Sequence, residues 1–382
     1  MPPISMRAEQ EAGVEPSGES IAVAEESQIE STVDSSAVNL KSSNVGTGGE
    51  VAVLPEVDVP VQFDFGDAES KQGKGGALVE LHFRKSPVDD DLAASIGSCG
   101  ELVKLTINTS KMTLEGWKQI GKLSKLQQLD LRGCNLGNRE LAAAVEGLSK
   151  LRALRMNGKS GATLVDDVGL ECLSGCKELK ALALDHLWVS GDGLAVLSEL
   201  PKLVELYLAG TLVDDDAMKR IVECEGMKKL RISQTSVGGP GILALAKLPL
   251  EDLDLSECSQ LGDDALESLG ELESLKKLNL FKTVISDTGI GYLSGLQSLE
   301  WFNVDQTPVS DAGLETIGKL SSLKFLHLGS TGVTDNGMPS LSELRSLENL
   351  IVTRTAVTET SVEELKSALP KLKVQLKYEG SN

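Results

Sequence analysis

The feature that most constrains this chain is a phrase of about 24 residues that recurs from Ala77 onward. The clearest copies begin at Leu275, Leu299 and Leu323. Further copies begin at Leu78, Leu102, Leu126, Leu151, Leu179, Leu203, Met227, Leu250 and Leu347, and a truncated one begins at Leu372. Such a period predicts a stacked array in which each unit buries its apolar face against its neighbours. The aromatic content of 3% suits the thin core of such an array.

Apolar residues recur at positions one, four and six of each copy, counted from its first residue. The spacing predicts a strand whose fourth and sixth side chains, such as Leu326 and Leu328, point inward. Strands of successive copies should pair in parallel about 4.8 Å apart. Leu314, Ile317 and Leu320 then have the spacing of a helix that packs onto the strands.

Two polar positions mark the turns of the repeat. Position nine is usually threonine, whose hydroxyl can satisfy a backbone group where the chain leaves the strand. Position thirteen is often aspartate, which we expect to open the helix as its N-cap or as an anion in its first turn. The members are Thr211, Thr235, Thr283, Thr307, Thr331 and Thr355, and Asp215, Asp287, Asp311 and Asp335. The copy from Leu151 carries an insertion at 157–163, which predicts a loop.

The sequence divides into a tail at 1–76, a repeat domain at 77–376 and a short tail at 377–382. Residues 1–76 combine low hydrophobicity with mostly negative charge, which predicts disorder. Apolar residues alternate over 57–65, so this stretch is either an extended linker or a strand that caps the first edge of the array. Residues 71–76 read as a flexible joint.

The phrase L-x-x-L-x-L-x-x-T-x-V-[ST]-D-x-G-L-x-x-L resembles bacterial leucine-rich-repeat proteins, particularly planctomycete-like ones. It is also similar to GALA-type and cysteine-containing repeats. The resemblance implies an α/β solenoid, or horseshoe, with a parallel β-sheet on its concave face and helices on its convex face. It also implies a non-enzymatic scaffold that binds a protein or peptide on the concave face. GALA-type proteins carry an F-box and recruit a ubiquitin ligase, so an adaptor of that type is an alternative.

Charge limits the class of partner. The formal net charge of −20 argues against nucleic acid and anionic membranes, since both attract basic surfaces. The sequence has neither a membrane-spanning apolar run nor a visible secretory signal, so we expect a cytoplasmic protein; an exported or surface-attached one is the alternative if the true N-terminus differs. We also expect a monomer.

Catalytic and metal chemistry find little support in the sequence. His82, His186 and His327 fall in separate copies, about 20 Å or more apart, so they cannot share one site. The cysteines lack the spacing of a zinc site, and we expect no cofactor. Runs of aspartate at one turn of several copies leave a calcium-dependent surface adhesion module as a further alternative. These runs are Asp89 to Asp91, Asp214 to Asp216, and Asp263 with Asp264.

Large aromatic residues gather at outward-facing strand positions near the C-terminal end. Trp301 and Phe325 occupy position three of adjacent copies, and aromatic clusters dominate many protein interfaces. The predicted partner-binding patch consists of Phe281, Trp301, Asn303, Phe325 and His327, with Asp305, Lys282 and Arg354 at its polar rim. The alternative is that Trp301 and Phe325 stack and only stiffen the sheet. Trp117 is expected in the core, while Trp188 lies on the turn after a strand.

Overall fold

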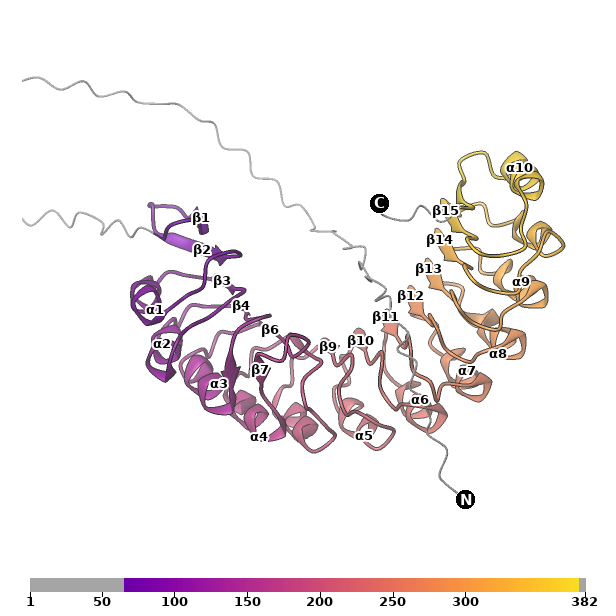
Figure 1. The fold of residues 1–382 in the computed structure, drawn as a ribbon. Coiled ribbons are helices and arrows are strands. Elements are labelled where there is room, and N and C mark those ends of the chain that lie inside the picture. Colours follow the sequence, from indigo (N-terminus) through magenta and orange to yellow (C-terminus); the bar gives the residue numbers. More distant parts are fainter. Residues whose placement is uncertain (1–64, 378–382) are drawn as a thin grey trace, which may run out of the picture. The chain divides into compact units, whose positions relative to one another are not determined.

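A computed structural model describes residues 65–377 of the chain. One sheet of fourteen strands runs through this part, and each strand pairs with those of the neighbouring copies. The strands line the inner side of a curve and the helices its outer side (Figure 1). All pairings within this sheet are parallel except the first. The predicted solenoid is confirmed.

The strands are short, because most copies contribute only positions three to five to the sheet. In the sheet they are β1 Glu69–Gln72, β2 Leu78–Phe83, β3 Lys104–Ile107, β4 Gln128–Asp130, β6 Ala153–Asn157, β8 Ala181–Asp185, β9 Glu205–Tyr207, β10 Lys229–Arg231, β11 Asp252–Asp254, β12 Lys277–Asn279, β13 Trp301–Asn303, β14 Phe325–His327, β15 Asn349–Ile351 and β16 Lys373–Gln375. Separately, β5 Leu136–Gly137 pairs with β7 Thr163–Leu164.

The predicted outer layer of helices contains both α-helices and 3-10 helices. The α-helices are α1 Asp90–Gly97, α2 Leu114–Ile120, α3 Asn138–Val145, α4 Asp167–Leu170, α5 Met218–Ile221, α6 Gly239–Leu245, α7 Asp263–Leu269, α8 Asp287–Tyr292, α9 Asp311–Ile317 and α10 Glu359–Ala368. The 3-10 helices are η1 Glu171–Gly175, η2 Gly193–Glu199, η3 Leu293–Gly295 and η4 Met338–Leu341. Within 65–377, no helix is long and apolar enough to span a bilayer.

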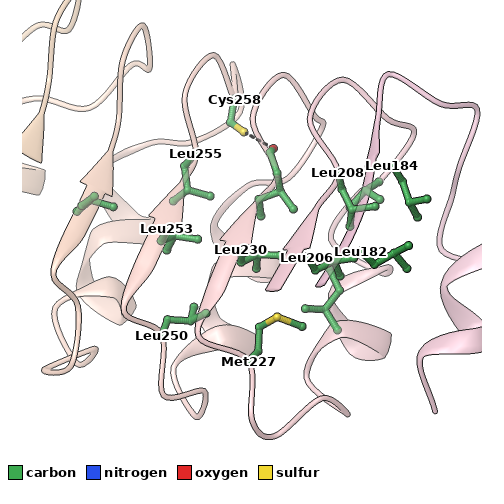
Figure 2. Close-up of a cluster of buried hydrophobic side chains, with 14 of the residues drawn as sticks. Leu182, Leu184, Leu206, Leu208, Met227, Leu230, Leu250, Leu253, Leu255 and Cys258 are labelled. Carbon is green, nitrogen blue, oxygen red and sulfur yellow. Dashed lines mark hydrogen bonds between the residues drawn. The ribbon is translucent and has the colours of Figure 1, made fainter. Parts of the chain in front are cut away.

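The core is a continuous row of leucines between sheet and helices. Figure 2 shows this row in the middle copies, where Leu253 of β11 lies beside Leu230 of the preceding copy and Leu255 follows just after the strand. Leu326 of β14 and Leu328, just after this strand, are completely buried, as are Leu314 and Ile317 of α9. The predicted inward register is therefore confirmed.

The N-terminal edge of the sheet is covered by an antiparallel strand that the sequence did not indicate. Strand β1 pairs with β2, and residues 73–76 form the turn between them. The sequence placed the domain boundary at 76/77 and a flexible joint at 71–76, because β1, ESKQ, has no apolar alternation. The alternative capping strand at 57–65 lies almost wholly outside the described residues. Its last residue, Phe65, packs edge-on against Phe83 at 6.2 Å between ring centroids.

The threonines of position nine act as predicted. The hydroxyl of Thr307 donates to the carbonyl oxygen of Val304 at 2.6 Å, and the other five threonines make the same bond. Cysteine replaces threonine at this position in two copies. There the thiols of Cys134 and Cys258 donate to a carbonyl of the preceding copy (Figure 2 shows Cys258). Burial raises the pKa of Cys134 to about 12, so this thiol stays protonated at neutral pH.

The aspartates of position thirteen connect successive copies. Asp287 is the first residue of α8, and the residue before it, Ser286, is the N-cap. Its carboxylate accepts bonds from the next copy: from the Ser310 N–H at 2.7 Å, the Ser310 hydroxyl at 2.5 Å and the Gly313 N–H at 3.0 Å. Asp90, Asp167, Asp215, Asp263, Asp311 and Asp335 reach the next copy in the same way. The expected first-turn position is confirmed for Asp287 and Asp311, where position twelve is the N-cap. It is wrong for Asp215 and Asp335, which precede α5 and η4 because those helices begin later in the copy.

Position eight turns the chain away from the sheet through a left-handed backbone. In each copy from Leu179 to Leu347 this residue has a positive φ, as in Lys282 at 54° and Gln306 at 57°. Such a conformation is unfavourable for residues other than glycine. Here it directs the N–H into the next copy, where that of Lys282 donates to the carbonyl oxygen of Asp305 at 2.9 Å. The side chains at position eight consequently form one row along the rim of the concave face.

Candidate binding surface

The candidate site lies where β13, β14 and β15 present their outward side chains on the concave face. Strand register places Trp301 beside Phe325 and Asn303 beside His327. The next strand continues the two rows with Asn349 and Ile351, which the sequence analysis did not select. Position seven adds a third row, containing Phe281, Asp305, Gly329 and Thr353 in successive copies.

Trp301 and Phe325 form a flat aromatic pair. Their ring centroids lie 5.1 Å apart and their planes differ by only 4°. Both residues are half-buried, so part of their apolar surface faces the concave side. His327 meets Phe325 edge-on, with 6.5 Å between ring centroids. Parallel strands in register bring these side chains together, since neighbouring strands lie about as far apart as the centroids of two stacked rings.

Three polar side chains converge beside this aromatic pair, above the backbone of Gly329. A Cβ atom placed on Gly329 would lie 2.9 Å from Asp305 Oδ1, 2.9 Å from His327 Nε2 and 3.0 Å from Thr353 Oγ1. Asp305 Oδ2 lies 3.9 Å from His327 Nε2. A residue with a side chain would therefore crowd these atoms, so glycine is what allows the three side chains to lie together over this backbone. We call this arrangement the Gly329 niche.

Burial sets the charge state of the niche. It lowers the pKa of the His327 imidazole, while the Asp305 carboxylate partly opposes this effect. Burial also raises the pKa of Asp305, opposed first by His327. Because burial holds the pKa of His327 below its usual 6.5, we infer that the imidazole is uncharged near neutral pH. In the niche, Asp305 offers acceptor oxygens and the Thr353 hydroxyl can donate or accept. One imidazole nitrogen of the uncharged His327 donates and the other accepts.

The remaining predicted residues surround this centre. The side-chain oxygen of Asn303 accepts the N–H of Asp305 at 2.9 Å, so Asn303 positions the niche. Lys282 is exposed and pairs with Glu257 at 2.9 Å. Arg354 is exposed at the same rim position and acts electrostatically on Asp305. Phe281 is half-buried in the position-seven row, one copy before Asp305. Register brings the predicted set to one region, while Thr353 and Gly329 were missed because neither stands out in the sequence.

The middle of the concave face differs, because its charged groups pair with one another. Arg231 forms an ion pair with Asp185 and lies over the Tyr207 ring, 5.2 Å from its centroid. Lys229 pairs with Glu205 at 3.1 Å. The aromatic residue here is thus already covered by a cation, in contrast to the open pair of Trp301 and Phe325.

The histidines and aspartates form no further centre in the described chain. His82 bonds with the Thr106 hydroxyl at 2.8 Å, and His186 lies several copies from both other histidines. No group of three or more histidine, cysteine or acidic side chains within 65–377 could hold a metal ion. One aspartate in each of the runs that suggested calcium accepts hydrogen bonds from the next copy, as Asp263 does from Ser286. An F-box ahead of the repeats would fall outside the described residues.

Comparison with known proteins agrees with the fold. Residues 122–139 and 319–342 match the Leucine Rich repeat family. The structure is similar to an internalin from Listeria monocytogenes, with 18% identity, a TM-score of 0.57, and coverage of 80% of this chain and 87% of that one. It is also similar to a leucine-rich-repeat protein of Leptospira interrogans, with 17% identity, a TM-score of 0.48, and coverage of 74% and 80%. No curated protein matches the sequence. Residues 65–377 thus fold as a leucine-rich-repeat solenoid.

Proposed function

We propose that this solenoid is a non-enzymatic scaffold that captures a protein or peptide on its concave face. The observation that carries the proposal is the open, flat pair of Trp301 and Phe325 beside the Gly329 niche. Large aromatic residues in a partly desolvated setting supply much of the energy at protein interfaces. Phe281, Asn303, His327, Asp305, Lys282 and Arg354 would complete the contact surface.

The chemistry of the niche favours an amide-containing ligand. A peptide group presents an N–H and a carbonyl together, and the niche offers an acceptor beside groups that can donate. Asp305 would accept the N–H, and Thr353 or His327 would donate to the carbonyl. A flat apolar side chain of the same ligand would rest on the aromatic pair. The resemblance to planctomycete-like and GALA-type proteins stays a prediction, and it does not identify the partner further.

The proposal is tested with peptides selected from a displayed library on the full chain. Dissociation constants are then measured for wild type and for Trp301→Ala with Phe325→Ala. We expect at least about 30-fold weaker binding, because truncating an interface anchor costs about 2 kcal/mol or more. Gln128→Ala, at position three of an earlier copy, is the matched control and should bind as wild type does.

The alternative is that the pair only stabilises the sheet, by roughly 0.5–1.5 kcal/mol. In that case the double variant unfolds at lower denaturant concentration but binds every selected peptide as tightly as wild type. Circular dichroism of both proteins separates loss of fold from loss of binding. Unchanged binding with an intact fold would refute the concave-face proposal.

A further inference from the structure

A second exposed apolar feature lies outside the concave face, at position ten of three successive copies. Leu164, Trp188 and Leu212 are 62%, 68% and 56% exposed. The copies are in register there: β7 pairs Leu164 with the preceding copy, Trp188 forms a parallel bridge with Asp166, and the Leu212 N–H donates to the carbonyl of Val189 at 2.9 Å. We call these three residues the lateral ridge.

Core packing does not account for the lateral ridge. Each of its members precedes a position-eleven valine that is completely buried, namely Val165, Val189 and Val213. The chain therefore satisfies the core with one residue and exposes the one before it. In the later copies position ten is filled by Ser236, Gln260, Val284, Pro308, Gly332 and Ala356, where Val284 is isolated. The ridge exposes on the order of 300–400 Å² of apolar surface, a size at which a patch on a monomer is often functional.

The surroundings of the lateral ridge are acidic. Residues 158–168, 186–192 and 210–216, which contain the ridge and its flanks, hold six aspartates and one lysine. Asp192 and Asp214 are exposed, and Asp216 is exposed but paired with Lys219 at 2.6 Å. An apolar strip flanked by carboxylates attracts a ligand that combines apolar and cationic side chains.

We infer that the lateral ridge docks a basic amphipathic segment of another protein. Charge excludes the two nearest competitors for this surface. A second copy would bring two acidic surfaces together, since the chain carries a formal net charge of −20. Residues 1–64 contain twelve acidic and two basic residues, so the chain's own N-terminal region is repelled as well. A helix with leucines at i and i+4 and lysines beside them would lay its apolar face along the ridge.

The test uses a synthetic 14-residue amphipathic peptide of leucine and lysine, titrated into the full chain carrying Trp301→Phe. This background removes the concave tryptophan, and Trp117 is completely buried, so Trp188 becomes the exposed reporter. We expect its emission to shift to the blue and saturate. A leucine–glutamate peptide of the same pattern should produce no shift, and 0.5 M salt should weaken the leucine–lysine peptide at least several-fold.

Variants then locate the contact. Leu164→Ser with Leu212→Ser should weaken the leucine–lysine peptide at least tenfold, and Asp192→Asn with Asp214→Asn several-fold. Val284→Ser is the matched control, because Val284 is exposed at the same repeat position without apolar neighbours, and it should change nothing. Equal binding by the Leu164→Ser and Leu212→Ser variant would overturn the proposal, and so would equal binding of the leucine–glutamate peptide. The proposal would also be overturned if wild type sediments as a dimer and the Leu164→Ser and Leu212→Ser variant as a monomer. That result would assign the ridge to a second copy.

Discussion

At the residue scale, position fifteen of each copy is determined by position thirteen of the copy before it. Wherever position thirteen is aspartate or asparagine, its side chain lies against position fifteen of the next copy, which is glycine in seven of eight cases. A Cβ atom on Gly313 would lie 2.6 Å from Asp287 Oδ1, which is too close. The glycines are Gly116, Gly169, Gly193, Gly241, Gly289, Gly313 and Gly337, and the eighth case is Ser361, whose hydroxyl donates to Asp335 at 2.6 Å.

The converse also holds. Where position thirteen is Leu114, Gly191 or Gly239, position fifteen of the next copy carries a side chain, namely Glu140, Ala217 or Ala265. The S/T-D-x-G phrase therefore recurs within each copy, but its aspartate and its glycine contact the neighbouring copies and not each other. The repeated sequence is enough to reveal this phrase. The reason for its glycine becomes clear only when it is known which copies are neighbours in the structure.

We predict that Gly313→Ala and Asp287→Gly are each destabilising but not additive. The alanine meets Asp287 Oδ1, and loss of the carboxylate leaves the Ser310 and Gly313 N–H groups without their acceptor. We expect each change to lower the free energy of unfolding by about 1–3 kcal/mol. The double variant reproduces the natural pair Gly191 and Ala217, so it should be more stable than the sum of the two losses implies. Denaturant unfolding of all four proteins gives the coupling energy, and strict additivity would contradict the steric explanation.

At the scale of the element, charged residues at position two connect neighbouring strands. Glu251 accepts from Lys228 at 2.7 Å and from Lys276 at 2.8 Å, so it joins three successive copies. Hydrogen bonds from these two lysines lower the pKa of Glu251 from 4.5 to about 2. A lowered carboxylate pKa stabilises the folded state above pH 4.5, and this contribution disappears as the pH falls from 4.5 toward 2.

We predict that Glu251→Gln flattens the pH dependence of stability in this window. The urea midpoint of wild type should fall more steeply than that of the variant between pH 5 and pH 3. Glu348→Gln is the control, because Glu348 has the same repeat position and no ion pair within 65–377. Parallel curves for wild type and Glu251→Gln would show that the two lysine contacts contribute nothing measurable.

The elements themselves differ in how well the sequence predicts them. The strands follow from the L-x-L spacing, since Leu326 and Leu328 must both face the core. The outer layer is less determined: η2 and η4 are 3-10 helices although their copies carry the same apolar spacing as α9. Strand β1 has only exposed side chains and therefore no apolar pattern in the sequence. The sequence does not predict it, because its position depends on backbone pairing with β2.

For the candidate surface, the sequence predicts which side chains are neighbours across the sheet but not how they pack together. Counting positions placed Trp301 beside Phe325 and His327 near Asp305, because register fixes which residues neighbour each other across a parallel sheet. It could not show that Asp305, His327 and Thr353 converge over Gly329, which depends on side-chain conformations in three copies.

At the scale of the whole molecule, each copy contacts chiefly its two neighbours, so a local defect should spread only a short way. We predict that Leu253→Ala, a completely buried position, lowers local stability by about 2–5 kcal/mol. Amide hydrogen exchange should accelerate in the copies from Met227, Leu250 and Leu275. The copy from Leu102 should stay protected.

Leu243→Ala, at a position that is 65% exposed, is the control for this experiment and should leave exchange nearly unchanged. Equal acceleration in every copy after Leu253→Ala would mean that the array unfolds as a single cooperative unit. That outcome would contradict nearest-neighbour coupling.

The aspartate-to-glycine contact between copies has a consequence for how such a gene can grow by recombination. Tandem duplication of Leu299 to Ser322 would create a seamless junction, because Asp311 would meet a second Gly313. Transplanting Leu250 to Ser274 into that junction would set the methyl group of Ala265 against an aspartate. The units look interchangeable when aligned, yet most of their junctions are of two kinds: aspartate against glycine, as in Asp287 and Gly313, or glycine against alanine, as in Gly191 and Ala217. Only exchanges that match the two sides of a junction yield an unstrained product.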